Sequence, residues 1–409
     1  MRVSGPEAGA ALGALAGSLP APRQASLRWL RDPRDGSLLD RALLLWFPGP
    51  RTATGEDLAE LHLHGGRSVV AAISAALADL PGLRPAEAGE FTRRAFANGR
   101  IDLAEAEGLA DLLAAETEGQ RRNALALASG ELSRAVEGWR RALLACWAGI
   151  EAILDFSDED DVPTNDEGFK GRLIETAAEI ETWLARPAAE RLRDGIRVVL
   201  AGPPNAGKST LLNALVGREA AITSATPGTT RDIIEAPVAI GGIAFLFSDT
   251  AGLRESSEEI ERIGVERART ALEGADIILW LDHPQNCPDR SRSIIIHARA
   301  DMAGRAAIPA GADIAVSAQC GTGMNVLVDL LREKAMALLP VPGEVALNRR
   351  QRDLLAECAA ALRLVESADE LLLVGESTRL ALHSLDRLTG RAGVEDMLDT
   401  LFGAFCIGK

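Results

Sequence analysis

The clearest chemical signal in the sequence is a glycine-rich loop, Gly202–Ser209, which reads GPPNAGKS. It fits G-x-x-x-x-G-K-[ST] at every fixed position, between an apolar run at Ile196–Ala201 and a helical pattern at Leu211–Leu215. Glycines let backbone N–H groups converge on phosphate oxygens, and a helix N-terminus adds its positive end. In such a loop Lys208 reaches the β- and γ-phosphates and the Ser209 hydroxyl ligates Mg²⁺. We therefore predict a nucleoside triphosphate site.

Three shorter motifs follow the loop in the order that GTPases use. Asp249–Gly252 (DTAG) comes after an apolar strand pattern, so its aspartate can hold Mg²⁺ through water and its glycine N–H can sense the γ-phosphate. Pro227–Asp232 lies upstream, where a switch threonine belongs. Ser317 and Ala318 end the last predicted strand, where backbone N–H groups read the guanine oxygen. Each motif alone is weak, but four in this order predict a GTPase.

The guanine-recognition motif departs from its usual N-K-x-D form. Ala298–Asp301, which reads ARAD, stands in its place. Asp301 can still accept two hydrogen bonds from the guanine edge, and Arg299 could stack on the base as a lysine stem would. Ala298 cannot supply the amide contacts of asparagine, and one such contact is worth about 1–3 kcal/mol, roughly tenfold to a hundredfold in affinity. We expect reduced nucleotide affinity and leave guanine preference open.

The residue that orients the attacking water is not where many small GTPases place it. Leu253 follows the DTAG motif directly, where a glutamine would stand, and a leucine cannot orient water. Residue types alone favour a solvated switch helix over a catalytic acid beyond this point, and both interpretations stay open. The acidic candidates there are Glu255, Glu258, Glu259 and Glu261.

The composition is that of a soluble globular protein with more than one domain. The chain has 409 residues, of which 25% are charged and 47% hydrophobic. No apolar run approaches the ~18 residues of a membrane helix, and the first residues show no signal-peptide pattern. Five cysteines without a C-x-x-C pair argue against zinc and fit a reducing cytoplasm. The formal net charge of −15 argues against a broad unaided nucleic-acid surface, so a local basic patch or a basic partner would have to hold RNA.

The pattern along the chain predicts a multidomain protein of the α/β plus α class. Residues 1–97 mix strand and helix signals, as an α+β domain does, and residues 98–193 are helical almost throughout. Strand and helix patterns alternate over 194–339, which implies a mostly parallel sheet with helices on both faces. Residues 340–409 are helical again, so we expect the α/β domain to be inserted into a helical domain. Its strand candidates are Ile196–Ala201, Ile243–Phe247, Ile277–Leu281, Ile294–Ile296 and Asp313–Val316.

Longer stretches extend beyond these motifs. Residues 259–264 read EIERIG, and the N-terminal region holds Trp46–Pro50, Thr54–Asp57 and Gly89–Phe96. The chain closes on Phe405–Lys409, which reads FCIGK. Together with the phosphate loop and the two switch motifs, these stretches resemble one family, the tRNA-modifying GTPases MnmE, also called TrmE. The resemblance spans nearly the whole chain, domain order included.

The resemblance implies three parts and several partners. An N-terminal domain would bind a 5-formyltetrahydrofolate-type folate and form a homodimer. A discontinuous helical domain would carry the terminal cysteine motif, and an inserted Ras-like G domain would hydrolyse GTP when two G domains meet. An FAD-dependent flavoprotein of the MnmG type would join in a heterotetramer and carry most of the tRNA contact. The product would be an aminomethyl or carboxymethylaminomethyl group on carbon 5 of the wobble uridine, with no membrane involved.

The resemblance also assigns catalytic roles in the nucleotide site, residue by residue. Glu261 matches the family's catalytic glutamate, which acts on the attacking water and favours that role over the solvated helix. Lys208 and Asp249 act with it, while Ser209 and Thr230 match the Mg²⁺ ligands. The nucleotide contacts it implies are Asn205, Ala206, Gly207, Lys208, Ser209, Thr210, Thr229, Thr230, Asp249, Gly252, Asp301, Ser317 and Ala318.

A K⁺ ion beside the nucleotide is a further implication of the resemblance. Asn205 would help to hold it, with Thr229 and main-chain oxygens near Ser224 and Thr226. A cation there would neutralise charge that develops between the β- and γ-phosphates, the task of an arginine finger in other GTPases.

The folate contacts carried over by position are Arg2, Glu60, Arg100 and Lys409. Arg100 stands where a lysine is common in the family, which keeps the charge but not the geometry. Cys406 is implied to be functionally important near the folate, and its alternative is a buried, inert thiol.

Two departures from the family pattern motivate an alternative function. The chain begins at the family's Arg-Val-Ser-Gly-Pro match, so we expect either a misassigned start or the loss of an edge strand. With Ala298, this suggests a GTPase-fold scaffold with weakened nucleotide binding that still holds folate and partner. Intact Lys208, Ser209, Asp249 and Glu261 favour an active enzyme. A ribosome-assembly GTPase would need a basic RNA-binding module, which we do not find.

Overall fold

The structure, a computed structural model, forms two compact units. The first comprises Met1–Ala110, Leu127–Leu144 and Leu382–Lys409, and the second Asp111–Ala126 and Ala145–Ala381. Among the described residues no helix is both long enough and apolar enough to cross a membrane. The predicted division at 97/98, 193/194 and 339/340 stays a prediction. The described residues are 1–155, 166–218, 220–221, 235–249, 269–305, 307–341, 343–392, 398, 401–403 and 405.

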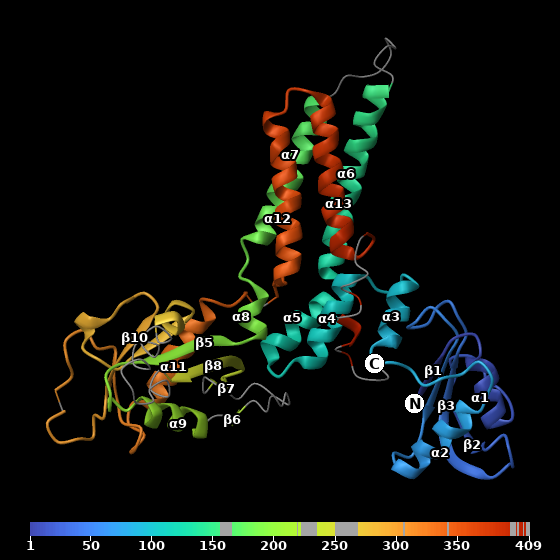
Figure 1. Cartoon of the computed structure of the whole chain (residues 1–409), viewed down its shortest axis with the longest axis horizontal. Helices are drawn as coiled ribbons and strands as arrows, with labels where there is room; N and C mark the ends of the chain where they lie inside the picture. Colours follow the sequence, from blue (N-terminus) through green and yellow to red (C-terminus); the bar gives the residue numbers. More distant parts are fainter. Residues whose placement is uncertain are drawn as a thin grey trace, which may run out of the picture. The chain divides into compact units, whose positions relative to one another are not determined.

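The N-terminal part of the first unit is an antiparallel sheet with strand order β1-β4-β3-β2 (Figure 1). One face of the sheet and both of its helices share a single hydrophobic core. Gly9 of α1 is buried against the Trp46 ring. The position suits a glycine, because a methyl group there would come 2.9 Å from that ring. The elements are β1 (Arg2–Ser4), α1 (Ala8–Ala16), β2 (Ser26–Arg31), β3 (Leu38–Phe47), β4 (Leu58–His62) and α2 (Arg67–Ala78).

The helical region after the sheet is divided more often than its sequence pattern suggested. Thr117 and Gln120 exchange side-chain and backbone hydrogen bonds of 3.3 and 2.9 Å, a capping box that begins a new helix. Gly130 adopts φ 78°, a left-handed conformation that ends the next one. The helices are α3 (Glu90–Ala97), α4 (Leu103–Ala114), α5 (Glu118–Ala128) and α6 (Glu131–Asp155).

The second unit contains a seven-stranded sheet with order β11-β10-β9-β5-β8-β7-β6. The strands from β11 to β8 are parallel, as predicted, whereas β7 and β6 run antiparallel at one edge. This edge was not predicted, because Pro237 within β7 argues against a strand. The strands are β5 (Ile196–Ala201), β6 (Ala220–Ala221), β7 (Glu235–Ile240), β8 (Ile243–Asp249), β9 (Ile277–Trp280), β10 (Ser293–Ala298) and β11 (Ile314–Val316).

Helices complete the core of this sheet. Leu211 and Leu215 of α9 and Leu327 and Leu331 of α11 are buried in the same cluster as the parallel strands. In both helices the apolar residues recur at helical spacing, so they form one face, and that face packs on the sheet. The helices and the turn of this region are α8 (Ala189–Arg193), α9 (Lys208–Arg218), the 3-10 turn η2 (Pro284–Asn286) and α11 (Met324–Met336).

Two long helices of the second unit, α7 and α12, lie side by side (Figure 1). Arg352 donates to the carbonyl oxygens of Leu184 and Arg186 at 2.8 and 2.9 Å, which satisfies the C-terminal end of α7. Asn348 and Gln351 form a capping box at the start of α12. The elements are α7 (Asp166–Leu184), α12 (Arg349–Arg363), the 3-10 turn η3 (Leu364–Ser367) and α13 (Leu371–Thr389).

Candidate functional site

The phosphate loop joins β5, a buried strand with helices packed beside it, to the N-terminus of α9. Gly202, Asn205 and Gly207 adopt φ of 149°, 60° and 98°, so the loop needs residues that tolerate positive φ. A methyl group on Gly202 would lie 3.1 Å from the backbone of Leu281, so the strand next to β5 also requires a glycine here. The loop therefore turns tightly at the carboxyl end of β5, where ligands of such folds bind and where backbone N–H groups can converge on a phosphate.

The Lys208 side chain folds back onto this loop. Its ammonium group donates to the carbonyl oxygens of Gly202 and Pro203, both at 2.9 Å, and the residue is only 6% exposed. These bonds hold the positive charge at the mouth of the loop, where the β- and γ-phosphates of a nucleotide would lie. The predicted position of Lys208 in the site is therefore consistent with its proposed role.

Ser209, in the first turn of α9, meets Asp249, the last residue of β8. The Ser209 hydroxyl donates to Asp249 Oδ2 at 2.6 Å, and the β5–β8 register places Asp249 opposite Leu200. Strand β8 runs on to Asp249 itself, two residues beyond the predicted end at Phe247. A hydroxyl and a carboxylate at this separation are hard oxygen donors of the kind that Mg²⁺ requires, so the residues fit this ion.

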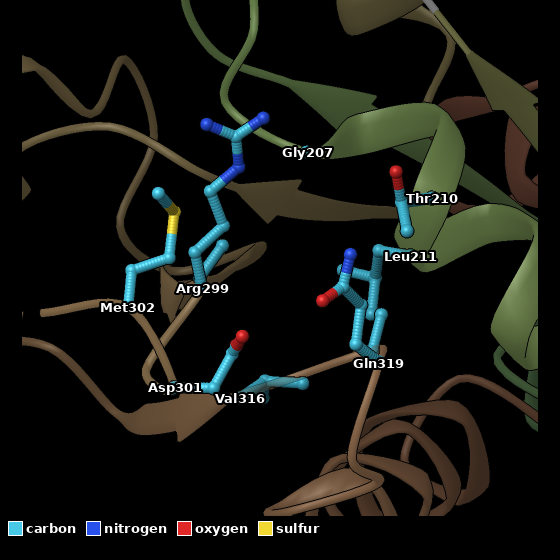
Figure 2. Close-up of a pocket in the computed structure, with 10 residues that line it drawn as sticks. Gly207, Thr210, Leu211, Arg299, Asp301, Met302, Val316 and Gln319 are labelled. Carbon is cyan, nitrogen blue, oxygen red and sulfur yellow. The ribbon is translucent and has the colours of Figure 1, made fainter.

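A separate cavity of about 280 Å³ lies beside the phosphate loop (Figure 2). One wall comes from the start of α9 and the other from the loops that follow β10 and β11. Arg299 has φ 58° and extends its side chain toward the loop, where a methyl group on Gly207 would lie 3.6 Å from its Nε. The lining residues are Gly207, Thr210, Leu211, Ala298, Arg299, Asp301, Met302, Val316, Ala318 and Gln319.

Asp301 and Ser317 are coupled at this cavity. The hydrogen bond that the fully buried Ser317 side chain donates lowers the pKa of the Asp301 carboxyl below its ordinary value of 3.8. Asp301 therefore stays a carboxylate, the form that accepts hydrogen bonds from the N–H groups of guanine. Ala298, the last residue of β10, is 7% exposed and offers only a methyl group.

The structure brings most of the predicted nucleotide residues together. Met302 and Gln319 line the cavity and were not predicted, although each is the direct neighbour of a motif residue. The residues placed at the loop or the cavity are Asn205, Ala206, Gly207, Lys208, Ser209, Thr210, Asp249, Asp301, Ser317 and Ala318. The predicted positions outside the described residues are Ser224, Thr226, Thr229, Thr230, Gly252, Glu261, Cys406 and Lys409.

In the first unit, two of the predicted folate residues lie next to each other. Arg2 on β1 is the register partner of Glu60 on β4, and its guanidinium lies 4.7 Å from the centre of the Phe91 ring. Arg100 lies elsewhere in the same unit, against Gly55, where an added methyl group would meet its Cγ at 3.3 Å. The structure therefore pairs Arg2 with Glu60, and it places Arg100, in the link between α3 and α4, against the loop that precedes β4.

The end of the chain packs on α3 within the first unit. Phe402 is 1% exposed and Phe405 5% exposed, and their rings are 6.1 Å apart. The Arg93 guanidinium lies 5.6 Å from the Phe402 ring, and Phe96 lies 6.3 Å from it. The GEFTRRAF stretch and the FCIGK stretch, noted separately in the sequence, therefore meet in this cluster, immediately before Cys406 in the sequence.

The central parallel sheet, the glycine loop that opens α9, the Ser209–Asp249 pair and the separate Asp301 cavity define a P-loop GTPase. Comparison with known families narrows this class. The family described as GTP-binding protein TrmE N-terminus matches residues 1–100, and the MnmE helical domain matches residues 103–406. The chain belongs to the MnmE (TrmE) family.

Curated relatives match over the full length. The tRNA modification GTPase MnmE of Sphingopyxis alaskensis is 61% identical and covers 100% of both chains. That of Rhizorhabdus wittichii is 60% identical over 100% of this chain and 93% of its own. Among solved structures, the G domain of the T. maritima FeoB iron transporter is 22% identical over 35% of this chain and 98% of its own, with a TM-score of 0.24.

Proposed function

We propose that this chain hydrolyses GTP to drive modification of tRNA at carbon 5 of the wobble uridine. The observation that carries the GTPase part is the Ser209–Asp249 hydrogen bond beside the Lys208 ammonium, at the mouth of a loop that fits the phosphate-binding pattern. The tRNA part is supported by full-length relatives whose name is tRNA modification GTPase MnmE.

In this proposal the described residues bind and orient the nucleotide. Backbone N–H groups of the loop and the Lys208 ammonium hold the β- and γ-phosphate oxygens, while Ser209 and Asp249 hold Mg²⁺. The ion, when bound, neutralises phosphate charge during transfer. Thr230 and Glu261, outside the described residues, are proposed as the second metal ligand and as the group that acts on the attacking water.

A K⁺ ion and the pairing of two G domains belong to the same proposal. Asn205 supports it, because its exposed side chain stands at the surface of the phosphate loop on a left-handed residue. A side-chain oxygen there could coordinate a cation beside the nucleotide. The other proposed contributors, Ser224, Thr226 and Thr229, lie outside the described residues.

A folate site in the first unit is also proposed, with Arg2, Glu60 and Arg100 as described contacts and with Cys406 and Lys409 from the chain end. Basic side chains suit the glutamate carboxylates of a folate. Equilibrium dialysis with 5-formyltetrahydrofolate should show weaker binding by Arg100→Ala and unchanged binding by Arg28→Ala, which removes an exposed arginine of β2. Equal binding by the two variants would exclude Arg100 from the site.

Self-association through the first unit is supported by an apolar strip on the edge strand β2. Leu27 and Trp29 are 55% and 54% exposed, and they point away from the core that holds Leu30. An edge strand with this face is a template for pairing, so we propose a homodimer. In sedimentation velocity, Leu27→Ser with Trp29→Ser should shift the protein toward monomer, whereas the exposed Leu19→Ser should not. A dimer that survives the double substitution would rule out this strip.

A flavoprotein partner of the MnmG type completes the proposal. The formal net charge of −15 leaves this chain poorly suited to hold tRNA phosphates over a broad surface. A basic partner would supply that surface, and the two proteins would act on the wobble uridine as a heterotetramer. The alternative is a scaffold with weakened nucleotide binding that still holds folate and partner, and among the residues of the nucleotide site Ala298 favours it.

Ala298→Asn is predicted to tighten guanine nucleotide binding. The new carboxamide at the end of β10 would restore a hydrogen bond to the base, worth about 1 kcal/mol or more, so Kd for GDP should fall about tenfold. Fluorescent-nucleotide titrations would measure this, with ADP as the control ligand. Unchanged affinity for GDP would show that position 298 does not contact the base.

Ser317→Ala is predicted to make guanine nucleotide binding more sensitive to acid. Asp301 binds the base as a carboxylate, so affinity is present above the pKa of Asp301 and is lost as the pH falls through it. Without the Ser317 hydroxyl that pKa rises, so the variant should lose GDP at a higher pH than the parent. Titrations from neutral pH down to about pH 3, below the ordinary aspartate pKa, would compare it with Ser291→Ala, which removes a hydroxyl that bonds Asp289 and does not line the cavity. Superimposable profiles would contradict the coupling.

Nucleoside analysis of cellular tRNA tests the function as a whole. A strain that lacks this gene should lose carbon-5 aminomethyl-type uridines, as measured by mass spectrometry of tRNA digests. The parent gene should restore them, and a Lys208→Ala allele should not. Unchanged uridines in the deletion strain would refute the proposal.

A further inference from the structure

The turn between α12 and α13 carries three leucine side chains that are more than half exposed among the described residues. Leu364 of η3 is 59% exposed, and Leu372 and Leu373 in the first turn of α13 are 63% and 52% exposed. Their neighbours Val365 and Val374 are fully buried. The turn is therefore well packed underneath, and the three leucines form a surface rather than an unfolded end. We refer to Leu364, Leu372 and Leu373 as the leucine tip (the joined end of α12 and α13 in Figure 1).

The leucine tip is held in place by the neighbouring helix. Lys170 of α7 donates from its ammonium group to the carbonyl oxygen of Ala368 at 2.6 Å, within the turn itself. Arg363, at the end of α12, forms a 2.6 Å ion pair with Glu181 of α7 and also contacts Glu366. These bonds hold the backbone of the turn in place in the free protein. Less conformational entropy is therefore lost when a partner binds.

Acidic residues lie in the chain between Leu364 and the other two leucines. Asp369 and Glu370, in the three-residue link between η3 and α13, are exposed, and neither forms an ion pair within the described ranges. The nearby cations are already engaged, Lys170 with a carbonyl oxygen and Arg363 with two carboxylates. The leucine tip is therefore an apolar centre with a negative rim, the pattern of a protein interaction site.

The rim charge decides the kind of partner. Phosphates of RNA and anionic lipid headgroups would be repelled by Asp369 and Glu370. A protein with an apolar patch rimmed by Lys and Arg would be complementary. In the proposed function the flavoprotein must carry the basic surface that holds tRNA, because this chain is strongly acidic. We propose that the leucine tip is a docking surface for that basic flavoprotein partner, an inference that rests on the proposed function.

The test is to titrate the intact protein with the purified flavoprotein of the same organism and to measure the binding by biolayer interferometry. Leu372→Ser with Leu373→Ser should raise Kd about tenfold or more, because both side chains lose their apolar burial. Val326→Ser with Met336→Ser is the matched control, since these α11 side chains are 55% and 62% exposed and lie outside the leucine tip. Asp369→Lys with Glu370→Lys should slow association and weaken its dependence on salt. GTP hydrolysis without partner should be unchanged in all variants, which verifies folding.

Each outcome decides one part of the inference. Weaker flavoprotein binding by the Leu372→Ser, Leu373→Ser variant, with the control variant unaffected, supports the docking surface. Parent-like binding by the leucine-tip variants overturns the docking surface and leaves the flavoprotein partnership intact. If the parent protein itself fails to bind the flavoprotein, the partner assignment of the proposed function is wrong, and the docking surface falls with it.

Discussion

Replacing Lys208 with alanine is expected to lower kcat for GTP hydrolysis about a thousandfold. The ammonium group lies 2.9 Å from two carbonyl oxygens of the phosphate loop, in a residue that is 6% exposed. A buried charge at that position stabilises the γ-phosphate more strongly in the transition state, where negative charge shifts between the phosphates. Its loss should therefore reduce turnover more than binding. Steady-state phosphate release measures both kcat and KM.

The matched control for this substitution is Lys334→Ala. Lys334 of α11 also donates to a carbonyl oxygen, that of Ser291 at 2.8 Å, but it does so on the exposed surface of the same unit. Its removal should leave kcat unchanged. If Lys208→Ala retained more than about a tenth of parental kcat, the assignment of the phosphate loop as the reaction site would be wrong.

Replacing Gly89 with alanine is expected to destabilise the first unit by about 2–5 kcal/mol. Gly89 adopts φ 67°, a left-handed conformation that costs other residues roughly 1–2 kcal/mol. A methyl group there would also lie 2.2 Å from the carbonyl oxygen of Phe402, and relief of such overpacking costs about 1–3 kcal/mol more. The chain end would have to move away from α3. Urea unfolding of the intact protein, followed by circular dichroism, measures the loss.

Gly13→Ala is the control for the Gly89 substitution. Gly13 lies inside α1, and an added methyl group would meet no atom within 4 Å. Alanine favours the helix there by about 0.5–1 kcal/mol, so this variant should be slightly more stable than the parent. A Gly89→Ala protein as stable as the parent would show that the chain end does not pack on Gly89 as described.

The sequence alone predicted the nucleotide loop well, because that loop depends on local rules. Gly202, Gly207 and Lys208 stand at fixed spacings, and the strand before them is apolar except for Arg197, a pattern typical of a buried parallel strand. The breaks within the predicted helical region were harder to place. They depend on Thr117 with Gln120 and on Gly130, which are short signals inside a long apolar pattern.

Features that join distant segments could not be predicted in the same way. The Asp301–Ser317 hydrogen bond depends on two loops that only the β10–β11 register brings together. The packing of Phe402 against Gly89 joins the two ends of the first unit, and nothing in either stretch indicates the other. Strand β7 was missed because Pro237, tolerated near a sheet edge, reads as a strand breaker.

The chain is a GTPase of the MnmE family, and we propose that its loop residue Asn205 works with a K⁺ ion. The direct measurement is GTP turnover by the purified protein in KCl and in NaCl at equal ionic strength, with ATP as the control substrate. If Asn205 works with K⁺, GTP hydrolysis should be rapid in KCl only, and ATP should be hydrolysed in neither salt. Turnover that is absent in both salts, or equal in both, would contradict it.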